Sequence, residues 1–360
     1  MKKLKISTNT IQRSTVLLLT LSFVTALLSL NTEARAKNNE PKSCYGSLQV
    51  IKPSQTLSPA RPPPNKHGST FSRNDENVRR FVTLNIYHKK LIVGPSIQGP
   101  DLGLIQNTDF GQLPKISSDG RQPFQVYAKP YDQSDKRRRI GIVINGLGLS
   151  DAATETAIQG LPGAITLAFA PYSKRLKEWI RFARAAGHEV LINVPMERAD
   201  YPTYIPGPYT LMTTLDSKKN LEHLLWNLGR GIGYVGVVDY YGSRFTASRT
   251  HMKPILREIK RRGLLYLDSG ISRQSTALSI SRQIEIPVAQ ATLTLDGVIS
   301  RRNIDIKFFE LEQHALKNGK AIGMASPYPV SLERIAAWAP RLEARGYAIV
   351  PITAIARAGN

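Results

Sequence analysis

Cysteine is almost missing from this chain, and its scarcity limits how the fold is stabilised. Cys44 is the single cysteine among 360 residues. No disulfide can therefore form within one molecule, and a disulfide framework of the kind found in small secreted domains is excluded. Cys44 also lies well past the apolar N-terminal segment, which argues against attachment as a lipoprotein.

Acidic side chains are scarce relative to basic ones. The chain has 27 Asp and Glu against 49 Lys and Arg, which gives a formal net charge of +22. Such a surface attracts anionic lipid surfaces, acidic polysaccharides or nucleic acids, unless it is simply a solvated basic face. No zinc finger, aromatic RNA platform or basic helix with heptads accompanies the charge, so no nucleic-acid partner is expected. An anionic membrane surface stays a candidate partner.

The apolar run near the N-terminus is short for a membrane span. It covers residues 16–30, roughly fifteen residues against the ~20 that a transmembrane helix needs. Basic residues precede it, and the small-x-small sequence Ala34-Arg35-Ala36 follows it, an order typical of a secretory signal. We predict that residues 1–36 are a signal peptide or membrane anchor. The protein is then exported, either periplasmic or anchored in the inner membrane and facing the periplasm.

Sustained hydrophobic periodicity is absent from residues 37–138. The proline-rich sequence at residues 59–64 predicts an extended backbone. Alternating apolar residues within 79–94 are compatible with a local strand pair, and residues from Gly111 onward form a strap into the next domain. We expect a basic, partly disordered N-terminal region with short ordered pieces.

From residue 139 to residue 356 the pattern changes to apolar strands that alternate with amphipathic helices. Seven or eight such units in about 215 residues predict an α/β fold, a distorted (β/α)7–8 barrel. Ser150 and Asp216 are expected helix N-caps, and Gly187 and Gly346 are expected helix ends. The expected strands are 140–145, 164–168, 189–193, 234–239, 264–268, 288–293, 321–325 and 348–351.

The active face of such a barrel is built from the C-terminal ends of the strands and the loops after them. The carboxylates at these ends, which could form a general acid/base pair or bind a hard cation, are Glu197, Asp239, Asp268 and Asp296. They could equally hydrogen-bond loop amides or pair with Arg244. The side chains expected to bind a ligand are Asn145, Asn193, Tyr209, Tyr240, Tyr241, Arg244, Ser326 and Tyr328.

Histidine is absent from these strand ends, although the chain has six. Zinc hydrolases normally use imidazole ligands with a carboxylate, so no metal ligands and no cofactor are expected here. Gly146-Leu147-Gly148 lacks the full glycine spacing of a nucleotide-binding turn. Gly242-Ser243-Arg244 lacks both the nucleophile-elbow pattern and a partner histidine, which argues against a serine hydrolase.

The segments from residue 139 to residue 355 resemble the divergent polysaccharide deacetylase family of bacterial envelopes. The likeness is carried by IGIVINGLGLS, ITLAFAPY, AAGHEVLINVPMERADYP, PGPYTL, GSRFT, RRGLLYLDSG and LEARGYAIVPITAI. The resemblance implies a distorted barrel related to metal-dependent carbohydrate esterases. Those enzymes remove acetyl groups from polysaccharide with a water bound to a divalent metal.

The sequence departs from that family at the positions where the resemblance implies metal ligands. Asn145-Gly146 stands where intact members carry consecutive acidic residues, and Asn193 precedes the Pro-Met-Glu segment where they often carry histidine. Asp239-Tyr240-Tyr241 replaces an Asn-His pair, and Ala325-Ser326-Pro327-Tyr328 replaces a Gly-His-Pro-His stretch. A neutral Asn can hydrogen-bond a sugar, but it neither balances a zinc charge nor acts as a base.

These observations favour a pseudoenzyme: an exported deacetylase-like protein of carbohydrate or cell-envelope metabolism that lacks metal-dependent catalysis. It would act by binding polysaccharide, peptidoglycan glycan or an envelope protein. The alternative is an active polysaccharide deacetylase with a non-standard carboxylate site. A third hypothesis is a scaffold, in which the N-terminal region tethers the barrel and the pocket is vestigial.

Overall fold

The computed structural model describes residues 100–204 and 207–356, which all belong to the unit Thr70–Asn360. The predicted signal segment, the proline-rich stretch and the strand pair within residues 79–94 lie outside the described residues. No helix in the described part of the chain is long and apolar enough to cross a bilayer.

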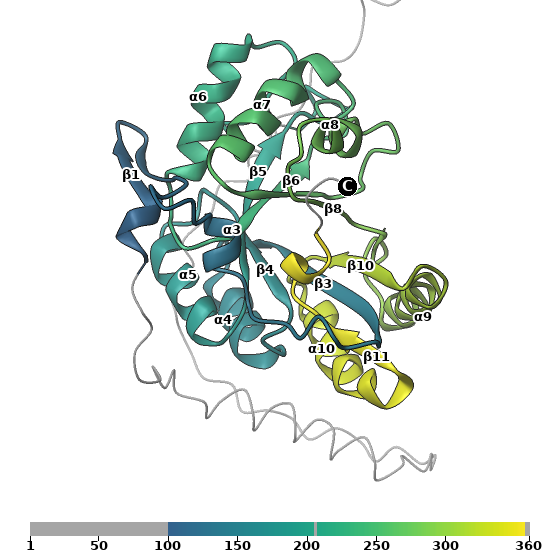
Figure 1. Cartoon of the computed structure of the whole chain (residues 1–360). Coiled ribbons are helices and arrows are strands. Elements are labelled where there is room, and N and C mark those ends of the chain that lie inside the picture. Colours follow the sequence, from purple (N-terminus) through teal and green to yellow (C-terminus); the bar gives the residue numbers. More distant parts are fainter. Residues whose placement is uncertain (1–99, 205–206, 357–360) are drawn as a thin grey trace, which may run out of the picture. The chain divides into compact units, whose positions relative to one another are not determined.

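A single curled sheet of parallel strands forms the centre of the fold (Figure 1). The strand order is β8-β7-β6-β5-β4-β3-β10-β9, and β11 pairs with the start of β3. The predicted α/β barrel is therefore confirmed. Its strands are β3 (Arg138–Leu147), β4 (Thr166–Phe169), β5 (Val190–Met196), β6 (Gly236–Tyr241), β7 (Leu265–Asp268), β8 (Val288–Gln290), β9 (Leu293–Thr294), β10 (Lys320–Ala325) and β11 (Tyr347–Ile349).

The strand expected over residues 288–293 is broken into two pieces, and this break distorts the barrel. Its first part, β8, pairs with β7, and its second part, β9, pairs with β10. Between them the backbone N–H of Ala291 still donates to Asp268 of β7, whereas that of Thr292 donates to Ile322 of β10. One segment thus changes partner within two residues and joins the two edges of the sheet.

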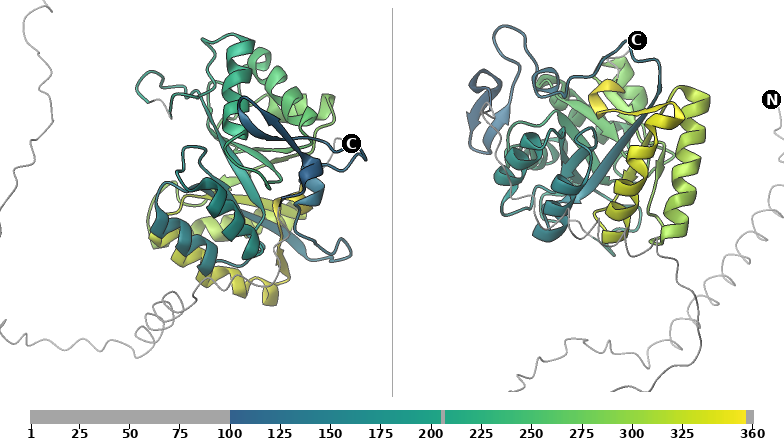
Figure 2. Two further views of the ribbon diagram at one scale, coloured as in Figure 1. Left: turned by 90° about the vertical axis from the view of Figure 1, so that its left-hand side faces the viewer. Right: turned by 90° about the horizontal axis from the view of Figure 1, so that it is seen from below.

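Helices surround the outer face of the sheet (Figures 1 and 2). The caps expected from the sequence are present, since Ser150 accepts from the third residue of α4 and Asp216 accepts from the third residue of α6. Gly187 takes the left-handed backbone conformation after its helix, as expected. The helix expected to end at Gly346 ends instead at Trp338, and Gly346 takes the left-handed conformation after a 3-10 turn, Glu343–Arg345. The α-helices after β3 are α4 (Asp151–Gly160), α5 (Leu176–Ala185), α6 (Ser217–Leu228), α7 (Arg249–Arg261), α8 (Ala277–Gln283), α9 (Arg301–Asn318) and α10 (Pro329–Trp338).

The strands bury side chains on both faces, because the barrel interior is packed and the exterior lies under helices. On β3, Ile140, Ile142 and Ile144 belong to the large core between sheet and helices. Val143 points the other way, into a smaller interior core with residues such as Leu191 of β5. The two cores explain why the strands read as nearly continuous apolar runs.

A hairpin and a strap precede the barrel. The hairpin pairs β1 (Ile105–Thr108) with β2 (Gly111–Pro114), and the strap contains the short helix α3 (Pro123–Val126) (Figure 2). Phe124, Tyr127 and Tyr131 of the strap pack against the interior core. The backbone N–H of Phe124 donates to the carbonyl of Gly263, just before β7. The expected strap therefore covers the end of the barrel where the strands begin.

Candidate functional site

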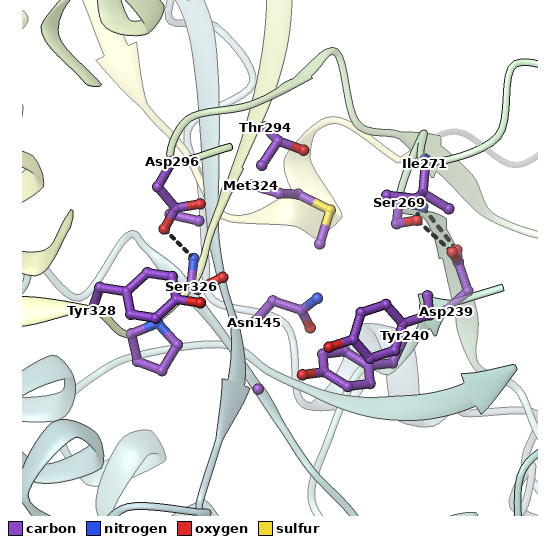
Figure 3. A pocket seen from close by; sticks show the side chains of 14 residues that line it. Asn145, Asp239, Tyr240, Ser269, Ile271, Thr294, Asp296, Met324, Ser326 and Tyr328 are labelled. Atoms are coloured by element: carbon purple, nitrogen blue, oxygen red, sulfur yellow. Dashed lines mark hydrogen bonds between the residues drawn. The ribbon is translucent and has the colours of Figure 1, made fainter. Parts of the chain in front are cut away.

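A pocket of about 250 Å³ lies at the end of the barrel where the strands finish (Figure 3). Parallel strands deliver their polar C-terminal residues to one edge, which is where barrel proteins place their sites. The pocket is lined by Asn145, Gly146, Asp239, Tyr240, Tyr241, Ser269, Ile271, Thr294, Asp296, Met324, Ala325, Ser326, Pro327 and Tyr328.

An amide pair forms one wall of the pocket. The Asn193 side chain donates from Nδ2 to Oδ1 of Asn145, and its own Oδ1 accepts from the backbone N–H of Gly146 at 3.0 Å. Gly146 has φ of 78°, a left-handed conformation that favours glycine. Asn193 is fully buried and does not line the pocket, so it fixes the Asn145 amide that does.

Asp239 is a buried carboxylate whose oxygens are already hydrogen-bonded. Oδ1 accepts from the Tyr266 hydroxyl at 3.0 Å and from the backbone N–H of Ser269 at 2.8 Å. Oδ2 accepts from the Ser269 hydroxyl (Figure 3). Burial, followed by the negative charge of Asp268, raises the pKa of Asp239 to about 7. The group therefore changes charge near neutral pH.

Asp296 lies across the pocket from Asp239 and holds the loop after β10 (Figure 3). Its Oδ2 accepts from the backbone N–H of Ser326 at 2.7 Å and from the Ser331 hydroxyl at 2.8 Å. Burial raises the pKa of Asp296 above its ordinary value. The carboxylate thus ties the segment that presents Ser326 to the start of α10.

The other two predicted carboxylates lie behind the pocket rather than in its lining. Asp268 accepts from the backbone N–H of Gly270 at 3.0 Å and from the Ser275 hydroxyl at 2.7 Å. Glu197 accepts from the backbone N–H and the hydroxyl of Thr213, at 2.5 and 2.6 Å. Its second oxygen lies 3.5 Å from Arg244, which also donates to a backbone carbonyl of the β5–α6 loop. These contacts organise loops, and the catalytic or binding roles assigned to these residues stay predictions.

Tyrosine rings cluster at the end of β6. Tyr240 and Tyr241 line the pocket with ring centroids 4.4 Å apart, and Tyr204 packs edge-on against Tyr241 at 5.2 Å. The Arg198 guanidinium lies over Tyr241 at 4.8 Å. Tyr241 has φ of 68°, which is strained for a residue with a Cβ and places consecutive rings on one side of the strand end.

Two further tyrosines of the predicted set have different positions. Tyr328 lines the pocket and is 42% exposed, so its ring is accessible at the mouth. Tyr209 stacks on Trp226 of α6, with ring centroids 3.8 Å apart and planes 8° apart, and it does not line the pocket. One face of the Tyr209 ring is therefore covered by the protein itself.

The donor set of the pocket does not fit a divalent metal of the kind that carbohydrate esterases use. Its lining contains two carboxylates and no imidazole. Both oxygens of Asp239 face hydrogen-bond donors from Ser269 or Tyr266, the opposite of what a cation needs. Among the described residues, no three His, Cys, Asp or Glu side chains form a group that could hold a metal ion.

The sequence did not single out several residues that line the pocket. Ser269, Ile271, Thr294 and Met324 belong to this set. Ser269 immediately follows Asp268, and Ile271 comes two residues later, so the strand-end rule that selected the carboxylate could have found them. Thr294 gave no such signal because it belongs to β9, the second half of a broken strand.

Comparisons with known proteins address the family. A curated relative from Escherichia coli, the uncharacterised protein YibQ, is 26% identical over 195 residues, and the match covers 54% of this chain but 60% of that protein. An uncharacterised protein from Haemophilus influenzae is 22% identical over 191 residues, which cover 53% of this chain and 67% of that protein.

A solved structure and a family model complete the comparison. An uncharacterised protein from Agrobacterium tumefaciens shares 38% identity with a TM-score of 0.66, and the match covers 68% of this chain and 99% of that one. The model of the divergent polysaccharide deacetylase family matches residues 142–356, from β3 to the C-terminal end of the described barrel. The resemblance seen in the sequence is confirmed, and the chain belongs to the divergent polysaccharide deacetylase family.

Proposed function

We propose that this protein binds a glycan in the pocket at the strand ends and does not hydrolyse it through a bound metal. The hydrogen bonds of the Asp239 carboxylate are the observation that supports this proposal. Its two oxygens accept three hydrogen bonds from Ser269 and Tyr266, so they hold a loop instead of facing a metal-bound water. Asn145 stands in the same pocket where the family resemblance implies acidic residues.

The pocket has the groups that a sugar requires. Its volume of about 250 Å³ equals that of about eight water molecules, which is enough for a small substituent of a sugar ring. Tyr240 and Tyr328 supply aromatic faces, and Asn145 and Ser326 supply amide and hydroxyl groups that both donate and accept. A few placed polar groups among aromatic rings are typical of small-molecule sites.

Retention on insoluble peptidoglycan and on polysaccharide resins tests the binding. We expect the purified protein to be retained, and Tyr240→Ala to lose retention. Tyr131→Ala is the matched control, because Tyr131 packs at the opposite end of the barrel, against the interior core. Absence of retention on every glycan, or equal retention of both variants, would refute the proposal.

A second candidate is an active deacetylase that uses carboxylates without the usual metal. The pKa of Asp239, raised to about 7, favours it because a general acid or base works best near the ambient pH. Release of acetate from acetylated glycans, lost in Asp239→Asn, would support it. Elemental analysis after incubation with zinc, manganese and nickel would show whether any such activity comes with a metal.

The site of action is proposed on the N-terminal sequence. Residues 1–36 have the order of a secretory signal, so we infer export to the periplasm, free or anchored in the inner membrane. An envelope protein is an alternative partner, and the N-terminal region would then act as a tether. Cell fractionation tests the location: recovery in the cytoplasm alone would contradict it.

A further inference from the structure

Exposed large apolar side chains gather at the pocket end of the barrel. They come from five different loops, each of which follows the C-terminal end of a strand. We call these residues the apolar rim: Leu149, Tyr204, Ile271, Val298, Ile299 and Tyr328, exposed by 62, 43, 55, 62, 54 and 42%. Two of them, Ile271 and Tyr328, lie on opposite sides of the pocket (Figure 3).

The composition of the apolar rim differs from that of the pocket that it surrounds. The pocket offers polar groups such as those of Asn145 and Asp239 among its apolar lining, whereas four of the six rim residues are aliphatic. Aliphatic side chains do not recognise the hydroxyl groups of a sugar. Single exposed apolar residues are ordinary on a protein surface, but a group of them around a site marks an interaction surface.

Exposed cations lie close to rim residues along the chain. Arg273 lies two residues after Ile271, and Arg302 lies in the first turn of α9, close after Ile299. Both are exposed, and neither forms an ion pair with any residue that the structure describes. Apolar side chains with interspersed free cations match a surface that presents acyl chains beneath anionic headgroups.

We propose that the apolar rim docks on an anionic lipid bilayer, so that the pocket opens toward the membrane surface. The cations near the rim disfavour two other occupants, which are a second copy of this chain and the chain's own segment 79–94. A second copy of this chain, with a net charge of +22, brings like charge to the same cations. The chain's segment 79–94 carries Arg79, Arg80, Lys89 and Lys90 without an acidic residue, and it is repelled for the same reason.

Docking of this kind places the pocket within reach of groups attached to lipid. The apolar side chains enter the interface, and the cations contact phosphate or carboxylate headgroups. A polar group on the membrane surface then faces Asn145 and Tyr240 without leaving the bilayer. The docking itself does not depend on what the pocket binds, so it can hold or fail independently of the proposed glycan binding.

A local fluorescent probe tests the docking in the full chain. Cys44→Ser removes the natural thiol, and Val298→Cys then carries an environment-sensitive dye on the rim. Phe309→Cys is the matched control, because Phe309 lies on α9 and is not a rim residue. Its exposed fraction of 63% is close to the 62% of Val298. The probe proteins are mixed with phosphatidylcholine vesicles with or without phosphatidylglycerol, and quenching by lipids with nitroxide-labelled acyl chains is measured.

We expect strong quenching of the Val298 probe on anionic vesicles, and little quenching of the Phe309 probe. A local readout is needed because the apolar N-terminal segment could hold the whole chain on vesicles by itself. Arg273→Gln with Arg302→Gln should lower the equilibrium constant for rim insertion about twenty-five-fold, because each lost cation lowers it roughly fivefold. Arg257→Gln, an exposed cation on α7, should leave it unchanged.

Equal quenching of the two probes on anionic vesicles would overturn the proposal. A second rim position, Leu149→Cys, checks that a negative result is not peculiar to one loop. If neither rim probe is quenched, docking of the rim on an anionic bilayer is refuted. Because no glycan is present in the assay, this failure is distinguishable from loss of retention on peptidoglycan.

Discussion

Asp239 provides the sharpest test of the electrostatics of the pocket. Its side chain is fully buried, and its pKa is raised from an ordinary 3.8 to about 7. The folded state therefore holds a proton that the unfolded state has already lost between these two pH values. The contribution of Asp239 to the free energy of unfolding must then fall as the pH rises from about 4 to about 7, and it levels off above that.

The magnitude follows from the two pKa values. Each tenfold difference in proton affinity corresponds to 1.36 kcal/mol, so the ionised Asp239 costs the folded state about 4 kcal/mol. Asn at this position stays neutral and still offers an oxygen to the donors of Ser269 and Tyr266. We therefore compare the free energy of unfolding of Asp239→Asn with that of the natural protein. The difference, variant minus natural protein, should rise by about 4 kcal/mol between pH 4 and pH 8.

Urea denaturation followed by tryptophan fluorescence, at pH values between 4 and 8, measures this difference. Burial also raises the pKa of Asp296 and Glu189, but their contributions are the same in both proteins and cancel. Ser269→Ala removes a hydrogen bond to the ionised form and so raises the pKa of Asp239 further, which should extend the loss of stability to higher pH and make it larger. A relative stability that is flat or falls with pH would refute the electrostatic reasoning.

Two further predictions concern the packing of the hairpin and the helices. Arg262→Ala should lower the free energy of unfolding by about 3 kcal/mol, because Arg262 is buried and contacts both Glu258 and the hairpin. Arg261→Ala removes an exposed partner of the same Glu258 and should lower it by less than about 1 kcal/mol in the same urea titration. Gly229→Ala should lower the thermal midpoint of unfolding, because a Cβ there would lie 1.9 Å from a carbonyl oxygen of the hairpin turn. Gly160→Ala in α4 is the control: a Cβ there meets nothing within 4 Å, so the substitution should raise the free energy of unfolding by about 0.5 kcal/mol. Equal effects of the two substitutions within either pair would contradict the packing described.

The local sequence was sufficient to predict most of the secondary structure. Apolar runs such as that around Ile142 predict buried strands, because strands packed on both faces need few polar residues. The expected helix caps at Ser150 and Asp216 were confirmed, since a cap acts within one turn of its own position. Residues 288–293, predicted as one strand, change their hydrogen-bond partner midway, and periodicity contains no information about partners. The hairpin of β1 and β2 was not predicted, because its two four-residue strands lie in a region without sustained periodicity.

The candidate site was predictable only in part. The rule that strand ends meet at one edge selected Asn145, Asp239, Tyr240, Asp296 and Tyr328, and the structure brings these five together in one pocket lining. The same rule also selected residues that lie behind or beside the pocket. The selected residues that do not line the pocket are two carboxylates, an amide, an aromatic ring and a guanidinium, those of Glu197, Asp268, Asn193, Tyr209 and Arg244.

The sequence by itself determined the order of strands and helices, the basic charge and the loss of imidazoles at the strand ends. Each of these depends on residue identity and on spacing within a few turns of the chain. Only the tertiary structure decided which strand-end groups face the pocket and which hold its loops. Asp239 shows the physical reason: its partners Ser269 and Tyr266 lie 27–30 residues away, on the next strand and the loop that follows it. The fold brings these donors to the carboxylate, and no local pattern encodes their approach.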